Sequence, residues 1–478
     1  MFKQVLLATC LLAVAAGHAL AQTTATLKHQ APDGAQLSFQ LTDGTVLAQG
    51  NVGNDWWKLT PDNTGSYVNG TWTQMASLQS GYEPNAESSA VLADGRLVII
   101  GGEYNFGQFA LTNLGAIYDP VANTWTPLAA PKTYPYIGDS PSLVLADGRF
   151  LLGRKLDKQM AALDPKTLTW TILGHTGKKD FNAEEGWTLL PNGTVLTYDV
   201  KKSPNSEIYD PVKQKWRSAG STVANLMSPP SEKSIRYPGG IYHPPGEVGP
   251  GLLLTNGTVF ATGSLHAGAN AGHTAIYTPG ANGAIGTWKA GPDFPNGDNA
   301  GDDFAVLLPT GNALVEGNSG RLYEFNGSSF NSGSVSGNGN SLMVLPTGEV
   351  LVGGTFVYRA AGSVNPAWAP TISQAPATVT RGSTYPITGT QFNGLSQAAS
   401  FGDELQTATN YPLVRITNTA TGHVFYTRTH DHSTMGVATG STPVSTNFDV
   451  PTTMETGASS LVVVANGIPS KAVNVTVK

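Results

Sequence analysis

The chain repeats one pattern of apolar and polar positions seven times: an apolar run, a short polar turn ending in glycine, and a second apolar run. The copies are FQLTDGTVLAQG, SAVLADGRLVIIGG, SLVLADGRFLLG, WTLLPNGTVLTY, GLLLTNGTVFATG, AVLLPTGNALVEG and LMVLPTGEVLVGG, with turn glycines Gly44, Gly95, Gly148, Gly193, Gly257, Gly311 and Gly348. Each copy predicts a β-hairpin. Asp-Gly and Asn-Gly favour primed turns, because glycine accepts a positive φ without a Cβ clash. A period of roughly 50 residues is typical of propellers and other repeat arrays.

A second pattern follows each hairpin: an aromatic strand, a short turn and a tryptophan. The clearest copies are AIYDPVANTW, with Tyr118 and Trp125, and EIYDPVKQKW, with Tyr209 and Trp216. We expect the tryptophans to pack between neighbouring sheets, since large aromatic side chains mostly serve cores. Gly-Gly, then tyrosine, then tryptophan resembles the kelch repeat, whose blades are four-stranded sheets around a channel. The resemblance implies a seven-bladed kelch-type β-propeller over residues 22–368.

The pattern changes from Pro370 onward. PTISQAPATVTRGSTYPITGTQFNG contains no hairpin phrase, and it resembles the opening of immunoglobulin-like domains of the IPT/TIG or E-set type. SSLVVVANGIPSKAVNVTV supplies two further strands around a Gly-Ile-Pro turn. We therefore predict an all-β chain in which an immunoglobulin-like β-sandwich over residues 369–478 follows the propeller.

The first residues are typical of a secretory signal. A lysine precedes an apolar stretch from Val5 to Ala16, and Ala19-Leu20-Ala21 forms an A-x-A cleavage site. The apolar run is shorter than the roughly 20 residues that a membrane span requires. We predict a signal peptide over residues 1–21 and a periplasmic or extracellular protein. Cys10 is the only cysteine, so the mature chain would contain no thiol.

Composition narrows the range of partners. Charged residues make up 13% of the chain, the net charge is −6, and there is no basic run. Nucleic acid and anionic membranes are therefore not expected partners. We expect a monomer that is not inserted into a membrane and that binds an extracellular glycan or sugar.

Acidic residues precede the hairpins, eight to ten positions ahead of the turn glycines. They are Glu87, Asp139, Glu184, Glu185, Glu247, Asp302 and Asp303. In a propeller, the loops leading into the innermost strands meet at one mouth of the channel, so these side chains would converge. Carboxylates that lie close together disfavour each other's ionisation, which suits acid–base work or cation binding. Alternatively, the acids cap loop amides or stay solvated.

A long loop between the fourth and fifth hairpins adds Arg236, Tyr242 and His243 ahead of Glu247. Long loops in compact domains tend to be functional or disordered. An arginine, a tyrosine, a histidine and a carboxylate in one loop suit sugar-acid binding or proton transfer. We assign catalytic roles to Glu185, His243, Asp139 and Asp303. We assign substrate-binding roles to Glu87, Glu184, Arg236, Tyr242, Glu247, Asp302 and Asn338.

Four further histidines leave two interpretations open. His266 and His273 follow the fifth hairpin, and either a functional or a structural role suits them. His430 and His432 would share one face of a strand, but two ligands without a third are a weak metal signal. We assign no metal ligands and no cofactor, apart from a calcium ion that the carboxylates could bind.

The whole arrangement resembles the secreted galactose oxidase and glyoxal oxidase family. The resemblance implies a copper ion held by two tyrosines and two histidines, one tyrosine being cross-linked to a cysteine. The corresponding positions here carry Glu87 for the cysteine, Asp139 for the cross-linked tyrosine, Asn338-Gly339 for a Tyr-His pair and Gln406 for a histidine. We therefore expect no copper-radical oxidation.

Three functions remain open at this stage. The chain is a saccharide hydrolase, lyase or epimerase without copper, a glycan-binding module without turnover, or a protein-interaction scaffold. Loss of turnover in Glu185→Gln or His243→Ala would favour the enzyme. Stoichiometric binding of uncleaved sugar would favour the module, and a wide, flat, aromatic mouth would favour the scaffold.

Overall fold

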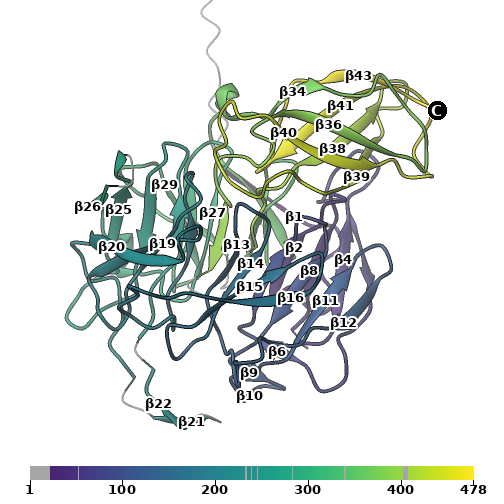
Figure 1. The fold of residues 1–478 in the computed structure, drawn as a ribbon. Coiled ribbons are helices and arrows are strands. Elements are labelled where there is room, and N and C mark those ends of the chain that lie inside the picture. Colours follow the sequence, from purple (N-terminus) through teal and green to yellow (C-terminus); the bar gives the residue numbers. More distant parts are fainter. Residues whose placement is uncertain are drawn as a thin grey trace, which may run out of the picture.

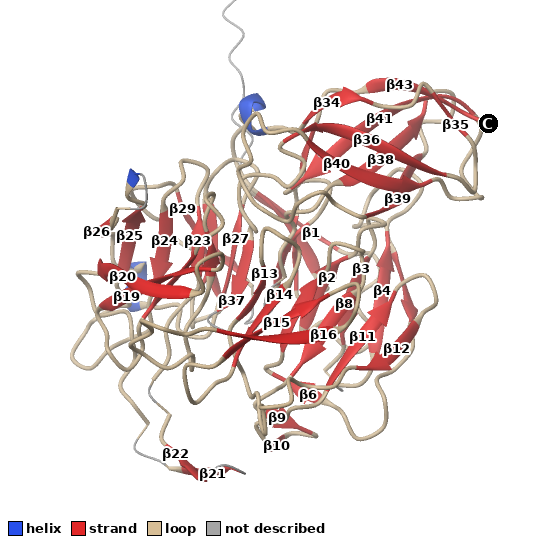
Figure 2. Ribbon diagram, viewed as in Figure 1, coloured by secondary structure: helices blue, strands red, loops and turns tan. Residues whose placement is uncertain are grey.

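The computed structural model describes residues 22–51, 53–231, 234–237, 240–244, 246–281, 284–337, 341–401 and 407–478. The predicted signal peptide therefore lies outside the described residues. The described chain is almost entirely β-structure (Figure 2), with short 3₁₀ turns at Pro295–Gly297 (η2) and Pro366–Trp368 (η3). It contains no helix with the length and apolar character that a membrane span requires.

Small antiparallel sheets follow one another along the chain. The first four contain, in sequence order, β2 (Leu37–Gln40), β3 (Val46–Gln49), β4 (Trp56–Thr60) and β5 (Thr71–Gln74); β7 (Ser88–Val91), β8 (Leu97–Ile100), β11 (Gly115–Asp119) and β12 (Thr124–Pro127); β13 (Ser142–Val144), β14 (Phe150–Gly153), β15 (Met160–Asp164) and β16 (Thr169–Leu173); β17 (Thr188–Leu189), β18 (Val195–Tyr198), β19 (Asn205–Asp210) and β20 (Lys215–Ser221). In each sheet the strands lie side by side in sequence order, as in the blades of a β-propeller.

The later sheets continue this order. They contain β23 (Gly251–Leu253), β24 (Val259–Thr262), β25 (Thr274–Thr278) and β26 (Thr287–Ala290); β27 (Phe304–Leu307), β28 (Ala313–Glu316), β29 (Arg321–Phe325) and β30 (Val335–Ser336); β31 (Leu342–Val344), β32 (Val350–Val352) and β33 (Phe356–Arg359). Smaller sheets are formed by β6 (Pro84–Asn85), β9 (Tyr104–Asn105) and β10 (Gln108–Phe109), and by β21 (Ile235–Tyr237) with β22 (Gly240–Tyr242). The result is an all-β architecture consistent with a propeller.

The last of these sheets is completed by the beginning of the described chain. Strand β1 (Thr23–Thr26) pairs antiparallel with β33, so that Thr23 lies opposite Arg359 and Thr26 opposite Phe356. A strand from one end of the array thus finishes the sheet at the other end. This pairing holds the two ends of the array together and closes it.

All seven predicted hairpins are present, but their turns are not of the predicted type. In the first, Gly44 N donates to Leu41 O and Leu41 N donates to Thr45 O, and the same pair of bonds recurs in the other six. Only the glycine has a positive φ, 75° at Gly44, whereas a primed type I turn needs two such residues. The pattern is that of a three-residue loop in which the glycine forms a bulge. The primed-turn prediction was therefore wrong.

The tryptophans pack between neighbouring sheets, as the sequence predicts. Trp125 on β12 lies opposite Tyr118 on β11, and its ring centroid is 4.8 Å from that of Trp56 in the preceding sheet. Its indole N–H donates to Ala76 O at 2.9 Å, just beyond β5. Trp170 repeats this bond one sheet later, to Ala129 O. Trp125 and Trp170 therefore each join their sheet to the preceding one by a hydrogen bond, and Trp125 also does so by ring packing.

Strands after η3 form a separate nine-stranded assembly. They are β34 (Thr371–Gln374), β35 (Thr378–Val379), β36 (Thr384–Thr390), β38 (Leu413–Asn418), β39 (Val424–His430), β40 (Val444–Asp449), β41 (Gly457–Ala465), β42 (Ile468–Pro469) and β43 (Val473–Val477). Figure 1 shows them at one end of the earlier sheets. They pack on the hairpin turns, where Thr429 N donates to Thr42 O and Met435 N to Ala146 O, each at 3.0 Å.

One strand from the C-terminal part leaves this assembly. Strand β37 (Ala399–Phe401) pairs antiparallel with β27, so that Phe304 lies opposite Phe401. It lies close to β23 and β31 as well, so it runs among the first strands of three consecutive sheets. Strand β37 therefore inserts from the C-terminal part of the chain into the repeat array.

Replacing Trp125 tests the packing between sheets. We expect Trp125→Ala to lower the free energy of unfolding by about 3 kcal/mol, because a large partly buried ring is lost. Trp125→Phe keeps a ring and loses the indole donor, and about 1 kcal/mol is expected. Urea unfolding measures both. Val121→Ala, at a side chain that is 71% exposed, is the control and should change little. Equal effects at the two positions would contradict the role assigned to Trp125.

Candidate functional site

The structure brings four of the predicted acids together around one lysine. Lys155 is fully buried, and its ammonium contacts Asp139 and lies 2.5 Å from Glu184 Oε1. Glu103 and Glu247 add their charge to its surroundings. Asp302 hydrogen-bonds to Glu247 and lies in the field of Glu184 and Lys155. We call these six residues the Lys155 cluster.

Topology explains why residues so far apart in sequence meet. Asp139, Glu247 and Asp302 precede β13, β23 and β27, which are the first strands of three different sheets. Glu103 and Lys155 follow β8 and β14, which are the second strands of their sheets. All five positions lie at the end of the sheets opposite the hairpin turns. The C-terminal strands cover the turn end, so the Lys155 cluster lies at the other end of the array.

The Lys155 cluster has a buried floor and an open side. Lys155, Asp139 and Glu184 are at most 5% exposed, whereas Glu103 and Glu247 are half-buried and Asp302 is reached by solvent. Protein nevertheless surrounds Asp302 closely enough that burial, together with the charge of Glu184, raises the pKa of Asp302 to about 7. An accessible carboxyl that titrates near neutral pH, above a buried ion-pair network, is suited to proton transfer.

The neighbours of these acids diverge into other surroundings. Glu184 belongs to the Lys155 cluster, but Glu185 is completely buried and pairs with Lys178 at 2.6 Å. Asp302 belongs to the cluster, but Asp303 is 8% exposed and faces Glu316, and burial raises its pKa to about 9. Glu185 and Asp303, which we predicted to be catalytic, therefore lie outside the Lys155 cluster, whereas Asp139 belongs to it.

The distance to the turn glycine distinguishes these two environments. Asp139, Glu184 and Asp302 stand nine positions ahead of their glycines, whereas Glu87, Glu185 and Asp303 stand eight ahead. Glu184 and Asp302 have positive φ values of 55° and 58°, which are uncommon outside glycine. The chain therefore turns sharply at Glu184 and at Asp302. In these two loops the side chain at the turn joins the cluster, and the next one points into buried surroundings.

Glu87 is isolated from the Lys155 cluster. It is 1% exposed, and Gln49 hydrogen-bonds to it. Its Oε1 has no hydrogen-bond partner among the described residues. Burial raises the pKa of Glu87 to about 8, so the carboxyl is largely neutral at physiological pH.

The long loop does not bring its residues to the cluster as a group. Arg236 lies on β21 and His243 follows β22, and both side chains are exposed. Figure 1 shows this hairpin extending away from the sheets. Of Tyr242 only the backbone, in β22, is described. Glu247 alone joins the cluster, while Asn338 and Gln406 lie outside the described residues.

The remaining histidines take part in local contacts. His273 Nδ1 lies 2.6 Å from Asp293, and its ring centroid is 5.1 Å from that of His266. His430 contacts Asp431 and Asp449. His432 contacts Thr446 Oγ1 at 2.9 Å instead, and burial lowers its pKa to about 3. His430 and His432 thus have different partners.

Sequence reasoning missed Lys155 and Glu103. In five of the seven copies the position six residues after the turn glycine is again glycine, but Arg154 and Asp199 stand there in the third and fourth copies. Lys155 follows Arg154 directly. A charged residue in place of the repeated glycine was therefore the available signal, both for Lys155 and for Asp199.

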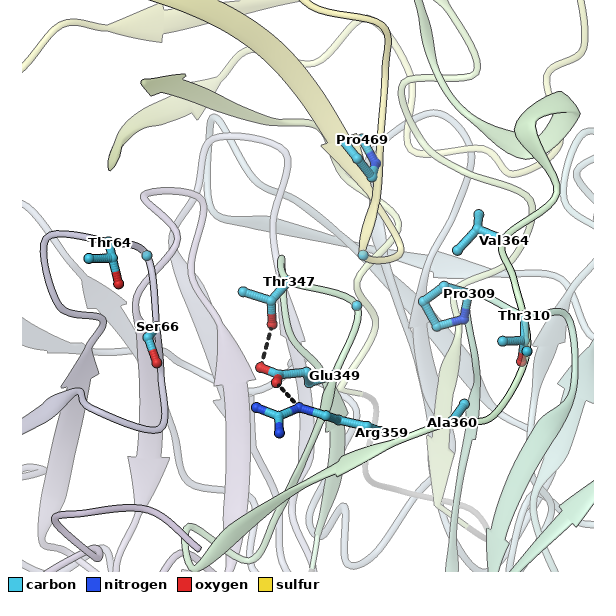
Figure 3. Close-up of a pocket in the computed structure, with 14 residues that line it drawn as sticks. Thr64, Ser66, Pro309, Thr310, Thr347, Glu349, Arg359, Ala360, Val364 and Pro469 are labelled. Atoms are coloured by element: carbon cyan, nitrogen blue, oxygen red, sulfur yellow. Dashed lines mark hydrogen bonds and ion pairs between the residues drawn. The ribbon is translucent and has the colours of Figure 1, made fainter. Parts of the chain in front are cut away.

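A pocket at the opposite end contains none of the predicted site residues (Figure 3). Its volume is about 570 Å³, and it lies between hairpin turns and the C-terminal strands. Arg359 Nε donates to Glu349 at 2.6 Å, and Thr347 Oγ1 donates to the same carboxylate at 2.9 Å. These groups satisfy one another, so the pocket offers weaker chemistry than the Lys155 cluster.

Comparison with known proteins gives two informative similarities. No protein-family profile matches the chain. Over 169 residues it is 28% identical to galactose oxidase from Gibberella zeae, which is 34% of this chain and 23% of that protein. The match thus spans about a quarter of the relative's length. The structure is similar to a novel fungal alcohol oxidase of the AA5 family in complex with copper, with a TM-score of 0.50 and 14% identity over 95% of this chain and 98% of that one.

These comparisons support a galactose-oxidase-like chain with the fold of an AA5 oxidase. A weaker similarity is found to streptogramin B lyase, with a TM-score of 0.47 and 10% identity over 72% of this chain and 98% of that one. It carries no further conclusion.

The described residues do not fit a copper-radical centre. The resemblance places Asp139 at the position of the cross-linked tyrosine, and a carboxylate that pairs with Lys155 cannot form a tyrosyl radical. It places Glu87 at the position of the cysteine, and a carboxylate cannot form a thioether. We therefore derive no chemistry through copper for this site.

Removing the buried lysine tests the Lys155 cluster. In Lys155→Met, Asp139 and Glu184 stay buried without their counter-charge, and a loss of about 3–5 kcal/mol in the free energy of unfolding is expected at pH 8. At pH 4 the loss should shrink, because the carboxyls can take up protons. Denaturant unfolding at both pH values measures the difference. Equal losses would show that packing, and not charge, is what Lys155 supplies.

Glu87 gives a second pH-dependent prediction. Its pKa is raised from the ordinary value of 4.5 to about 8, so the folded state binds the proton more tightly than the unfolded state. Its contribution to stability is therefore present below about pH 4.5 and is lost as the pH rises to about 8. Glu87→Gln should match the unaltered chain at pH 4 and be more stable than it at pH 9. Urea unfolding across this range would refute the prediction if the difference stayed constant.

Proposed function

We propose that this chain is a secreted, seven-bladed β-propeller with a C-terminal immunoglobulin-like sandwich, and that it binds and processes an extracellular saccharide at the Lys155 cluster. The similarity to galactose oxidase supports a saccharide as the ligand. The pattern at residues 1–21 supports export. The closure of the array by β1 and β33 supports the propeller, and the nine strands after η3 support the second domain.

One observation carries the chemical part of the proposal. Asp302 is accessible to solvent, and its pKa of about 7 lets it give or take a proton at neutral pH. Beneath it, Lys155 holds Glu184 and Asp139 as ion pairs. A protonated carboxyl beside carboxylates is the arrangement that glycoside cleavage uses, and proton abstraction next to a sugar carboxylate needs similar groups.

We assign a role to each residue of the Lys155 cluster. Asp302 exchanges the proton with the substrate, and Glu247, which hydrogen-bonds to it, orients its carboxyl. Glu103, which is half-buried, accepts hydrogen bonds from sugar hydroxyls. Lys155, Asp139 and Glu184 hold the floor in place from below.

A screen of polysaccharide digestion, with a glycan array alongside, tests the function. For a substrate found in this way, we expect Asp302→Asn to lower kcat by about 10²–10⁴-fold, the usual contribution of a general acid or base. The arm of the pH–rate profile near pH 7 should disappear with it. Glu103→Gln should mainly raise KM. Glu455→Gln, at a partly exposed carboxyl near the end of the chain, is the matched control and should leave both constants unchanged.

The same screen separates the alternatives. Sugar binding without turnover, unchanged in Asp302→Asn, would select a non-catalytic glycan-binding module. If no glycan is bound or cleaved, the saccharide proposal fails and an interaction scaffold remains.

A further inference from the structure

A second group of charged residues lies in the sheet β17–β20, separate from the Lys155 cluster. Asp180 and Glu185 precede β17, Asp199 follows β18, and Glu207 lies on β19. Lys178 is fully buried among them, with Glu185 at 2.6 Å and Glu207 at 3.0 Å. Its ammonium also lies 4.6 Å from the centre of the Trp216 ring. We call these five residues the Lys178 cluster.

Three of the carboxylates are arranged as cation ligands. One oxygen from each of Asp180, Glu185 and Asp199 lies within 4.8 Å of the other two. All three side chains are at most 2% exposed. Two oxygens that bind one Ca²⁺ at about 2.4 Å are separated by no more than about twice that distance. The three oxygens are therefore close enough to share one ion.

Asp199 supplies the independent observation. The carboxyl is 2% exposed, yet neither of its oxygens accepts a hydrogen bond from any described residue. Buried polar groups are almost always satisfied, so an orphaned carboxyl calls for an explanation. Asp180, in contrast, is held in place, because Oδ2 accepts the backbone N–H groups of Lys201 and Lys202 at 2.7 and 3.1 Å.

The net negative charge of the Lys178 cluster also favours a bound cation. Four carboxylates face one ammonium, which leaves up to three uncompensated negative charges in a buried space. A divalent cation would remove most of this repulsion and would supply the partner that Asp199 lacks.

The ligand set also selects the kind of ion. Every candidate ligand is a carboxylate oxygen, and neither histidine nor cysteine belongs to the group. Oxygen-only sites prefer hard cations, and a buried site with several carboxylates and little room for water suits Ca²⁺ better than Mg²⁺.

We propose that Asp180, Glu185 and Asp199 form a binding site for a hard divalent cation, with Ca²⁺ as the preferred ion. The site does not depend on the proposed saccharide function. Because Glu185 directly follows Glu184, a bound ion would also fix the segment that carries Glu184 into the Lys155 cluster.

Calcium binding to the full chain tests the proposal. The protein is stripped with chelator, and CaCl₂ is added at pH 7.5 in a calorimetric titration and in thermal unfolding. We expect one site, and a rise in Tm of about 3–5 °C when the ion exceeds its dissociation constant about a hundredfold. Asp199→Asn keeps the shape and removes one charged ligand, and its affinity should fall at least about tenfold.

The variant also distinguishes a lost site from a damaged fold. In chelator, Asp199→Asn should be at least as stable as the unaltered chain, because buried repulsion is relieved. In calcium the order should reverse. Asp147→Asn, at a side chain that is 52% exposed in a hairpin turn, should keep the full calcium response.

Two results would overturn the proposal. One is that none of Ca²⁺, Mg²⁺ and Mn²⁺ raises the Tm of the unaltered chain, which would show that the three carboxylates bind no such ion. The other is that Asp199→Asn keeps the full response, which would place any bound ion elsewhere.

Discussion

The pairing of β1 with β33 is the constraint on which the rest of the structure depends. Each sheet is apolar on both faces, and both faces must be covered by neighbouring protein. A row of such sheets in an open arc would leave its first and last members half uncovered. By completing the last sheet with the first strand, the chain removes these two ends. The closed array in turn forces the loops before every first strand towards one common axis.

The Lys155 and Lys178 clusters are two consequences of that constraint. Two of the loops carry carboxylates at two successive positions, and the sharp turns at Glu184 and Asp302 send the side chains of Glu185 and Asp303 in other directions. In each cluster the acids surround a buried lysine and form ion pairs with it. Buried ammonium groups of this kind cost desolvation energy, which only several carboxylates together can offset.

Sequence alone predicted the fold further than the site. The hairpins, the inter-sheet tryptophans and the change near Pro370 depend on local periodicity, which a single sequence displays. The turn type was mistaken because Asp-Gly suits both a primed turn and a glycine bulge, and only the φ of Asp43 separates the two. The convergence of Asp139, Glu184 and Asp302 was predictable from their repeated offset. Lys155 and Glu103 were not found, because their importance arises from neighbours that the closed array brings from distant sheets.

Strand β37 has a consequence for how the molecule is made. During synthesis β27 leaves the ribosome nearly a hundred residues before β37, and β1 must wait for β33, more than three hundred residues later. The repeat array is therefore complete only once residue 401 has been made. A chain that stops before β33 would leave β1 without its partner, and one that stops between β33 and β37 would leave the open edge of β27 uncovered.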